Sequence, residues 1–193
     1  MDKKLERRAQ TSIIEPLLHN DLIAALDNIP SQLDALYANI PDKKRISYGR
    51  VHTIKVLANY LYSQLLEEKA SGITLASKLF ETTKERRIVS VALCLLSLYG
   101  QEAFPKAISY FEMAAMSDDW EVREFSQMFF RKIIQHHPDA INRYLLNKVQ
   151  SKEPNLRRFV AETLRPCVEN KWIYDQPDYS LCVLRHLYHE NVA

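Results

Sequence analysis

The sequence predicts an all-α fold built from antiparallel helix pairs, and three observations support this prediction. Apolar residues recur at helical spacing in nearly every segment, whereas the alternation typical of a half-buried β-strand is missing from the pattern. The chain of 193 residues contains only 3 glycines, which leaves little material for tight hairpin turns. The third observation is an internal repeat, which decides how the helices are expected to be arranged.

Helices are expected wherever the apolar period of about 3.6 residues is maintained. We expect Asn20, Pro30, Pro41 and Gly72 to interrupt helices, and Gly100 to cap the C-terminal end of one. Because the connections are short, successive helices should pack antiparallel. The expected helices are, in chain order, 11–18, 20–28, 31–39, 47–68, 73–82, 84–99, 101–116, 119–136, 139–150, 155–169 and 178–189.

The repeat is clearest between EVREFSQMFF, residues 121–130, and NLRRFVAETL, residues 155–164. Val122 falls on Leu156, so the period is 34 residues, and a weaker third copy starts at Glu85. One further helix is expected between successive copies, and helix pairs with such a period are typical of an α-solenoid. We therefore expect one domain over residues 1–193, a right-handed α-solenoid of HEAT-like antiparallel helix pairs. Its predicted core includes Val122, Phe125, Phe129, Leu156, Phe159 and Leu164.

The helix faces opposite this core carry charged and aromatic side chains. Residues at i and i+4 share a helix face, so Trp120 and Glu124 form one stripe, and Arg158 and Glu162 form a second on the next copy. Each charged residue taken singly is more often an ordinary solvated side chain. Trp120 also follows an acidic N-cap cluster, so a packing role at the helix start is an alternative. Arg131 and Arg165 are expected to lie on the same two faces.

Composition excludes several classes of function. The formal net charge of +2 is too small to argue for nucleic-acid binding by itself, so any basic patch must be local. The charged N-terminus has no apolar signal segment, and no apolar run approaches the length of a membrane span, so we expect a soluble cytoplasmic protein. Cys94, Cys167 and Cys182 are expected to be free thiols. His186 and His189 lack further ligands for zinc, and we expect no metal.

The segment from Asp119 to Trp172 resembles the AlkC/AlkD-like DNA alkylation repair family, the HEAT-like-repeat DNA glycosylases of bacteria. The likeness is greatest to the AlkC branch, in LRRFVAETLRP, and a weaker likeness extends through most of the chain. It depends on WEVREF (120–125), the pair Arg157 and Arg158, then Glu162, and Arg165 followed by Pro166.

The resemblance implies that duplex DNA lies in a concave groove and that N3- or N7-alkylated purines are excised from it. Such a purine is already a cationic leaving group, so a carboxylate that stabilises the positive charge developing on the deoxyribose is sufficient. Arginines would hold the flanking phosphates without reading sequence. By motif position, the resemblance makes Glu124 and Glu162 catalytic and assigns DNA contacts to Trp120, Arg157, Arg158 and Arg165.

The sequence departs from the family pattern at three points. Thr163 stands where the pattern has a glycine, CVENKW follows Pro166 in place of a basic continuation, and the chain stops where the family continues with another repeat. These departures bear on catalysis more than on the fold. We expect a monomer without a cofactor that binds double-stranded DNA containing alkylated bases. The alternative is a non-catalytic HEAT-repeat scaffold that binds DNA or a protein partner.

Overall fold

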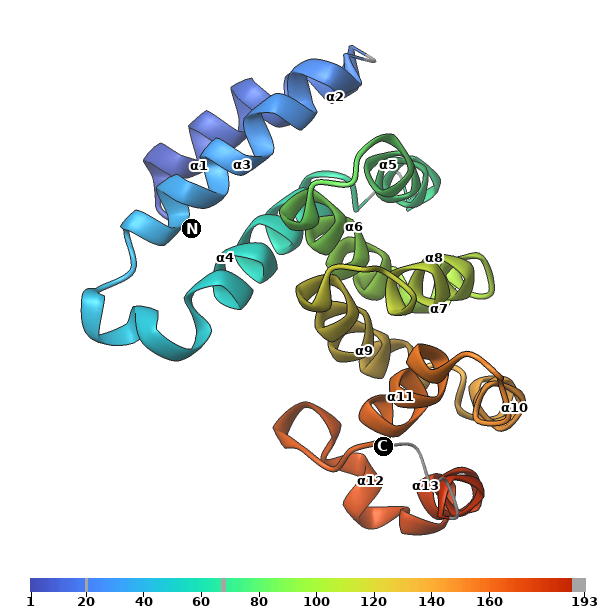
Figure 1. The fold of residues 1–193 in the computed structure, drawn as a ribbon. Coiled ribbons are helices and arrows are strands. Elements are labelled where there is room, and N and C mark those ends of the chain that lie inside the picture. Colours follow the sequence, from blue (N-terminus) through green and yellow to red (C-terminus); the bar gives the residue numbers. More distant parts are fainter. Residues whose placement is uncertain (20, 67–68, 189–193) are drawn as a thin grey trace. The chain divides into compact units, whose positions relative to one another are not determined.

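A computed structural model describes residues 1–19, 21–66 and 69–188. These residues are all-α: helices and turns account for the regular structure, and none of them lies in a β-strand. The all-α prediction is therefore confirmed over the described part of the chain. The chain divides into two compact units, Met1–Tyr99 and Gly100–Ala193, and each is described by itself. The helices of both units are labelled in Figure 1.

In the first unit, α6 is the central helix. Ten of its residues, from Ile88 to Ser97, are buried, and both α4 and α5 pack against it. The helix α3 packs against α4 and against the N-terminal elements. The elements of this unit are α1 (Lys3–Ala9), η1 (Gln10–Ile14), α2 (Glu15–Leu18), α3 (Leu22–Ala38), α4 (Asp42–Gln64), α5 (Lys69–Thr82) and α6 (Arg86–Leu98).

Two predicted helix breaks in this unit are wrong. The helix α3 continues through Pro30, although a proline removes one intrahelical hydrogen bond. The helix keeps a continuous buried face around this position, so packing outweighs the lost bond. Gly72 lies inside α5, where a Cβ atom would come within 2.0 Å of the Tyr99 hydroxyl oxygen. Glycine therefore lets α5 approach Tyr99 closely. The break predicted at Asn20 lies outside the described residues.

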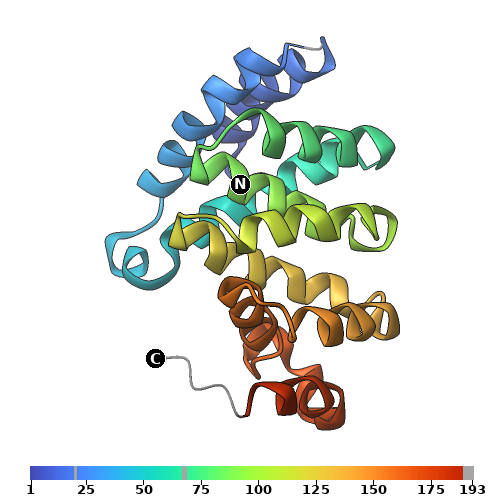
Figure 2. The ribbon, with the colours of Figure 1, turned by 45° about the vertical axis from the view of Figure 1, so that its right-hand side comes forward.

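The second unit, Gly100–Ala193, contains the candidate site. The helix α9 packs against α8 and α11, and α10 packs against α11 and α13, as can be followed in Figures 1 and 2. The elements are α7 (Gly100–Ala103), α8 (Lys106–Ala115), α9 (Trp120–Ile134), α10 (Pro138–Lys148), α11 (Pro154–Thr163), η2 (Val168–Asn170), α12 (Trp172–Asp175), α13 (Pro177–Leu184) and η3 (Arg185–Leu187).

Several boundaries in this unit differ from the prediction. Gly100 begins α7 and has no positive φ, so it does not cap α6. The expected helix 101–116 is divided ahead of Lys106. The helix α11 ends at Thr163 and not at 169, because a residue before proline avoids the helical region, and Pro166 follows closely. The segment between α11 and α12 consequently forms a turn with its own polar contacts.

The predicted core of the repeat is confirmed, since all six expected positions are buried. Phe130 of α9 lies at its centre: its ring centroid is 5.4 Å from that of Phe111 on α8 and 5.1 Å from that of Phe159 on α11. Tilted and edge-to-face ring contacts at such distances stabilise beyond the apolar area they bury. These rings fix α9 between α8 and α11, which determines the faces that α9 and α11 leave exposed.

Candidate nucleic-acid interface

The helices that carry the predicted site residues begin in register with the repeat. α6, α9 and α11 start at Arg86, Trp120 and Pro154, so each begins 34 residues after the one before. Each has an acidic N-cap residue whose carboxylate accepts a hydrogen bond from a backbone N–H of the first turn. Such caps satisfy donors that a helix start would leave without a partner.

The turns before α9 and α11 repeat the same hydrogen bonds in detail. The Ser117 hydroxyl accepts from the backbone N–H of Asp119 at 3.2 Å, and the Ser151 hydroxyl accepts from that of Glu153 at 3.1 Å. Each turn is therefore held by its own serine and its own acidic cap. The two helix starts have the same local geometry, so equivalent side chains of α9 and α11 can be compared directly.

The side chain of Arg157 is hydrogen-bonded to the turn before α11. Its Nη1 donates to the Ser151 carbonyl oxygen at 2.8 Å, and Arg123 makes the equivalent bond to the Ser117 carbonyl at 2.7 Å. Both guanidinium groups have an Nε atom that solvent does not reach. The side chain of Arg157 thus stabilises the turn before α11, whereas the resemblance implied a contact with DNA.

The structure overturns the expected exposure of Arg131. We predicted it on the open face of α9, but its residue is only 3% exposed, and its Nη2 donates to the Glu162 carbonyl oxygen at 2.6 Å. The last carbonyls of α11 lack intrahelical partners and carry partial negative charge, which favours a cation at this end of the helix. Arg131 therefore ties α9 to the C-terminal end of α11.

Trp120 is the first residue of α9 and is 63% exposed. The helix is capped by Asp119, whose carboxylate accepts from the Glu121 backbone N–H at 2.8 Å. The start of α9 is thus organised without the indole. A large aromatic side chain so open to solvent at an ordered helix start is suited to stacking on a ligand.

The carboxylate of Glu124 joins α9 to α11. Its Oε1 accepts from Nη2 of Arg158 at 2.6 Å, and its Oε2 accepts from Nε2 of Gln127 at 2.5 Å. The Arg158 side chain is 54% exposed, whereas Gln127 as a residue is only 4% exposed. Sequence reasoning missed Gln127, although its spacing of three residues from Glu124 could have indicated a contact on one helix face.

Glu162 forms a second ion pair, with Arg165 on the turn that follows α11. The distance from Arg165 Nη1 to Glu162 Oε2 is 3.2 Å, and the two side chains are 59% and 28% exposed. That carboxylate oxygen is shielded from solvent and has no hydrogen-bond partner among the described residues, so the pair is an electrostatic contact without good hydrogen-bond direction. The Glu162 side chain is less exposed than the side chain of Glu124, the other candidate carboxylate.

The side chain of Asn170 is hydrogen-bonded to the backbone at the C-terminal end of α11. Its side-chain Nδ2 donates to the carbonyl oxygens of Thr163 at 3.0 Å and Arg165 at 3.4 Å. Thr163 and Asn170 are both fully buried, and the Thr163 hydroxyl and the Asn170 Oδ1 have no partner among the described residues. Thr163, which departs from the family pattern, therefore points into the protein and leaves the open face of α11 unchanged.

The structure brings together most of the predicted site residues on α9 and α11. Arg158 pairs with Glu124, Arg165 pairs with Glu162, and Trp120 lies one turn from Glu124 on the same helix. Each candidate carboxylate is thus paired with an exposed guanidinium group, and the exposed Trp120 precedes Glu124 by one helical turn. Such a surface offers donors to an anion, carboxylates to a cation and a flat apolar face to a ring.

Other kinds of site receive no support from the part of the chain that the structure describes. Within residues 1–19, 21–66 and 69–188, no three His, Cys, Asp or Glu side chains are grouped as a metal site would require. In the same residues, every helix is too short or too polar to cross a membrane. Comparisons of the chain with protein-family models, with curated proteins and with solved structures find no match.

Proposed function

We propose that this protein binds duplex DNA along the exposed faces of α9 and α11 and hydrolyses the N-glycosidic bond of N3- or N7-alkylated purines. The observation that carries the proposal is the Glu124–Arg158 contact of 2.6 Å between the two helices, one turn from the exposed Trp120. A phosphodiester needs cationic donors, a ring needs a flat aromatic face, and a cationic base needs a carboxylate. This cluster supplies all three.

The proposed architecture is a right-handed HEAT-like α-solenoid. The support is the regular start of α6, α9 and α11 every 34 residues, together with the repeated turn before α9 and α11. In such an array the equivalent helices line one side and form an extended binding surface. The DNA groove is then the surface on which Trp120, Glu124, Arg158 and Arg165 lie.

Each side chain has a distinct role in the proposed reaction. Arg158 and Arg165 neutralise backbone phosphates and set the position of the duplex without reading sequence. Trp120 contacts the sugar and the cationic base, to which the ring face is attracted. Glu124 and Glu162 stabilise the positive charge that develops on the deoxyribose as the bond to the base stretches, and orient the attacking water. The alkylated base leaves without a strong general acid.

The decisive experiment is the release of free base from methylated duplex DNA. We expect 3-methyladenine or 7-methylguanine to appear above a protein-free control. Glu124→Gln and Glu162→Gln should each lower the rate about a hundredfold, because a well-placed electrostatic contact typically contributes that much. Asp175→Asn, at an exposed carboxylate of α12, is the matched control and should leave the rate unchanged. Absence of methylated purines from the products would refute the glycosylase activity.

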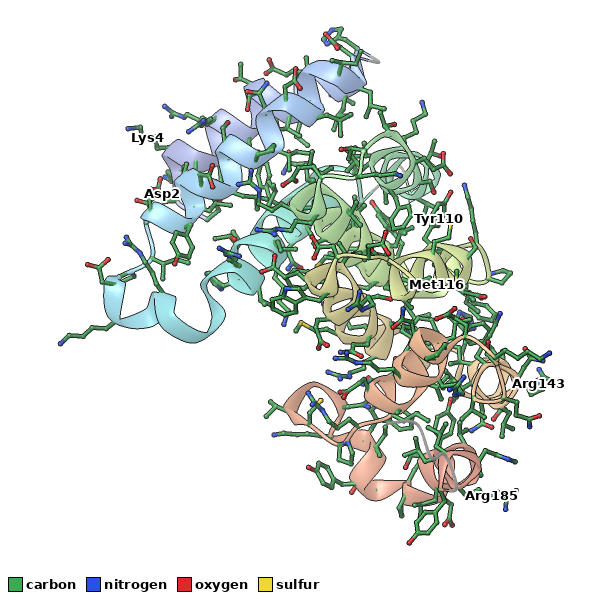
Figure 3. All side chains as sticks on the ribbon, in the orientation of Figure 1. Asp2, Lys4, Tyr110, Met116, Arg143 and Arg185 are labelled. Atoms are coloured by element: carbon green, nitrogen blue, oxygen red, sulfur yellow. The ribbon has the colours of Figure 1, made fainter. Side chains whose placement is uncertain are left out.

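DNA binding is tested separately from catalysis by fluorescence anisotropy. Affinity should fall with salt, with a slope of about 0.9 on a log–log plot for each phosphate contact. Arg158→Ala should weaken binding to damaged and undamaged duplexes alike. Arg143→Ala is the control, since Arg143 is an exposed arginine of α10 that points away from the helices of the site, as Figure 3 shows. Equal losses for both variants would contradict a defined DNA surface.

A second candidate function is a non-catalytic helical-repeat scaffold for DNA or a protein partner. The observation that favours it is that both candidate carboxylates are already in ion pairs, with Arg158 and with Arg165. A surface whose charges satisfy one another needs no ligand to be stable. A partner protein captured in stoichiometric amount, resistant to nuclease, and lost on Trp120→Ala would support this scaffold over the glycosylase.

A further inference from the structure

Gln127 is a buried amide whose side chain is directed at a candidate catalytic carboxylate. It lies one turn after Glu124 on α9, and its Nε2 donates to Glu124 Oε2 at 2.5 Å. A buried amide that makes one well-directed bond to a carboxylate restricts the rotamers of both side chains. Its contact with Glu124 is therefore more than a solvated surface interaction.

The two partners of Glu124 differ in what a ligand can do to them. Arg158 comes from another helix and is about half exposed, so a phosphate in solution can reach its guanidinium group. Gln127 is 4% exposed and cannot be reached in the same way. An anion that binds Arg158 competes with Glu124 Oε1, whereas the bond from Gln127 to Oε2 is left intact.

We propose that Gln127 is a positioning residue that holds the Glu124 carboxylate in place while Arg158 exchanges Glu124 for a DNA phosphate. In the free protein, Arg158 neutralises Glu124. In the complex, the phosphate takes Arg158, and Glu124 faces the lesion with its charge uncompensated and its orientation kept by Gln127. This inference rests on the proposed DNA binding, but it does not depend on base release.

The exchange has a consequence that binding measurements can detect. Without Gln127, both carboxylate oxygens of Glu124 can turn to Arg158, and a two-oxygen pair with a guanidinium group is stronger than a single contact. Glu124 then competes better with phosphate. Gln127→Met, which keeps the volume but removes the donor, should weaken duplex binding about threefold, the range expected for a partly exposed ion pair.

The test is a double-mutant cycle with Gln127→Met, Glu124→Gln and the double variant. For duplex affinity at low salt, Gln127→Met should matter only when Glu124 is present and should have no effect in the Glu124→Gln background. A role in packing alone would lower affinity by the same factor in both backgrounds. That additive result would overturn the proposal, as would unchanged affinity for Gln127→Met in the otherwise wild-type chain.

A second cycle measures urea unfolding of the same four proteins without DNA. The contact predicts coupling of about tenfold in the unfolding equilibrium constant, as expected for a hydrogen bond to a charged group. If the wild-type protein fails to bind duplex DNA, the proposed function is rejected, whereas the unfolding cycle still decides whether Gln127 holds Glu124. No coupling in that cycle would overturn the positioning role regardless of DNA.

Discussion

Two neighbouring positions of the repeat behave in opposite ways. At the first position, Arg123 and Arg157 are identical and make the same bond to the carbonyl of the preceding serine. At the next position, Glu124 and Arg158 have opposite charge and pair with each other across the helices. The position that is identical in both copies makes a contact within its own turn. The position that differs makes a contact between the two helices, on the surface that we propose to bind a ligand.

The largest expected effect concerns Arg123 and Arg157, the position at which the two copies are identical. Arg157→Met should lower the free energy of unfolding by about 2 kcal/mol, because it leaves a turn carbonyl without its charged donor. Arg123→Met should have a similar effect. Both are measured by urea unfolding followed by circular dichroism. Duplex affinity should change little in the folded variant, and a salt-dependent loss of binding would show instead that Arg157 contacts phosphate.

A pH-dependent effect should come from a buried contact of the same unit. Tyr144 of α10 donates to Glu112 at 3.2 Å, and burial, followed by the charge of Glu112, raises the pKa of Tyr144 well above 10. The folded state keeps this proton longer than the unfolded chain does, so stability is complete below pH 10 and declines as the pH rises above it. The decline attributable to Tyr144 should approach about 1.4 kcal/mol per pH unit.

The measurement compares unfolding of the wild-type protein and Tyr144→Phe between pH 8 and 11. Tyr144→Phe should flatten the decline above pH 10. Salt should change this dependence little, because the contact is shielded from solvent. The exposed Glu124–Arg158 pair should show the opposite behaviour, a dependence on salt. Identical pH profiles for the two proteins would mean that folding does not raise the pKa of the Tyr144 hydroxyl.

A smaller effect is expected at Glu124 and Arg158, the position at which the two copies differ. Glu124→Arg places two arginines together, and this loss of the ion pair should cost about 1 kcal/mol of stability at low salt in addition to the lost bond from Gln127, while it increases affinity for any duplex. The exchange variant Glu124→Arg/Arg158→Glu should recover the part of the stability that comes from the ion pair, because it restores a pair with the order reversed. Urea unfolding at two salt concentrations distinguishes these outcomes. Failure of the exchange to recover stability would show that neighbouring groups, not the pair itself, set the preference.

The smallest effect on stability is expected for Trp120. Trp120→Leu should change the free energy of unfolding by less than about 0.5 kcal/mol, since the side chain is largely solvated. The same substitution should remove most of the fluorescence change on adding duplex DNA, which leaves Trp172 as a half-buried reference. A large loss of stability would place Trp120 with the folding contacts and remove it from the proposed surface.

The sequence predicted the parts of this fold that depend on periodicity. The all-α class, the six core positions and the starts of α9 and α11 follow from apolar spacing and from the 34-residue repeat, which act locally. The failures have long-range causes. Pro30 stays in a helix because the helix is packed, and Gly72 serves a contact with Tyr99, which lies far away in sequence.

The candidate site was predictable to the same extent. Helical spacing placed Trp120 and Glu124 on one face, and equivalent spacing placed Arg158 and Glu162 on another. It could not distinguish an arginine that points outward from one that reaches a neighbouring helix, because a long side chain can do either. Arg131 and Arg157 satisfy carbonyl groups, and Gln127 holds a carboxylate. The Arg131 contact depends on the distance between α9 and α11, which a one-dimensional pattern does not contain. The contacts of Arg157 and Gln127 are local and depend on the rotamer that a long side chain adopts.

The repeated turn has a consequence for how this protein can change in length. The serine, the acidic cap and the arginine that stabilise each turn belong to the same copy. Each copy therefore contains all the residues that make these hydrogen bonds. A duplication or deletion in register, such as residues 117–150, would preserve every one of these turn contacts at the new junction. We therefore expect that the chain can gain or lose a whole copy without losing the contacts that hold each turn, and that the proposed binding surface would change in length by one copy.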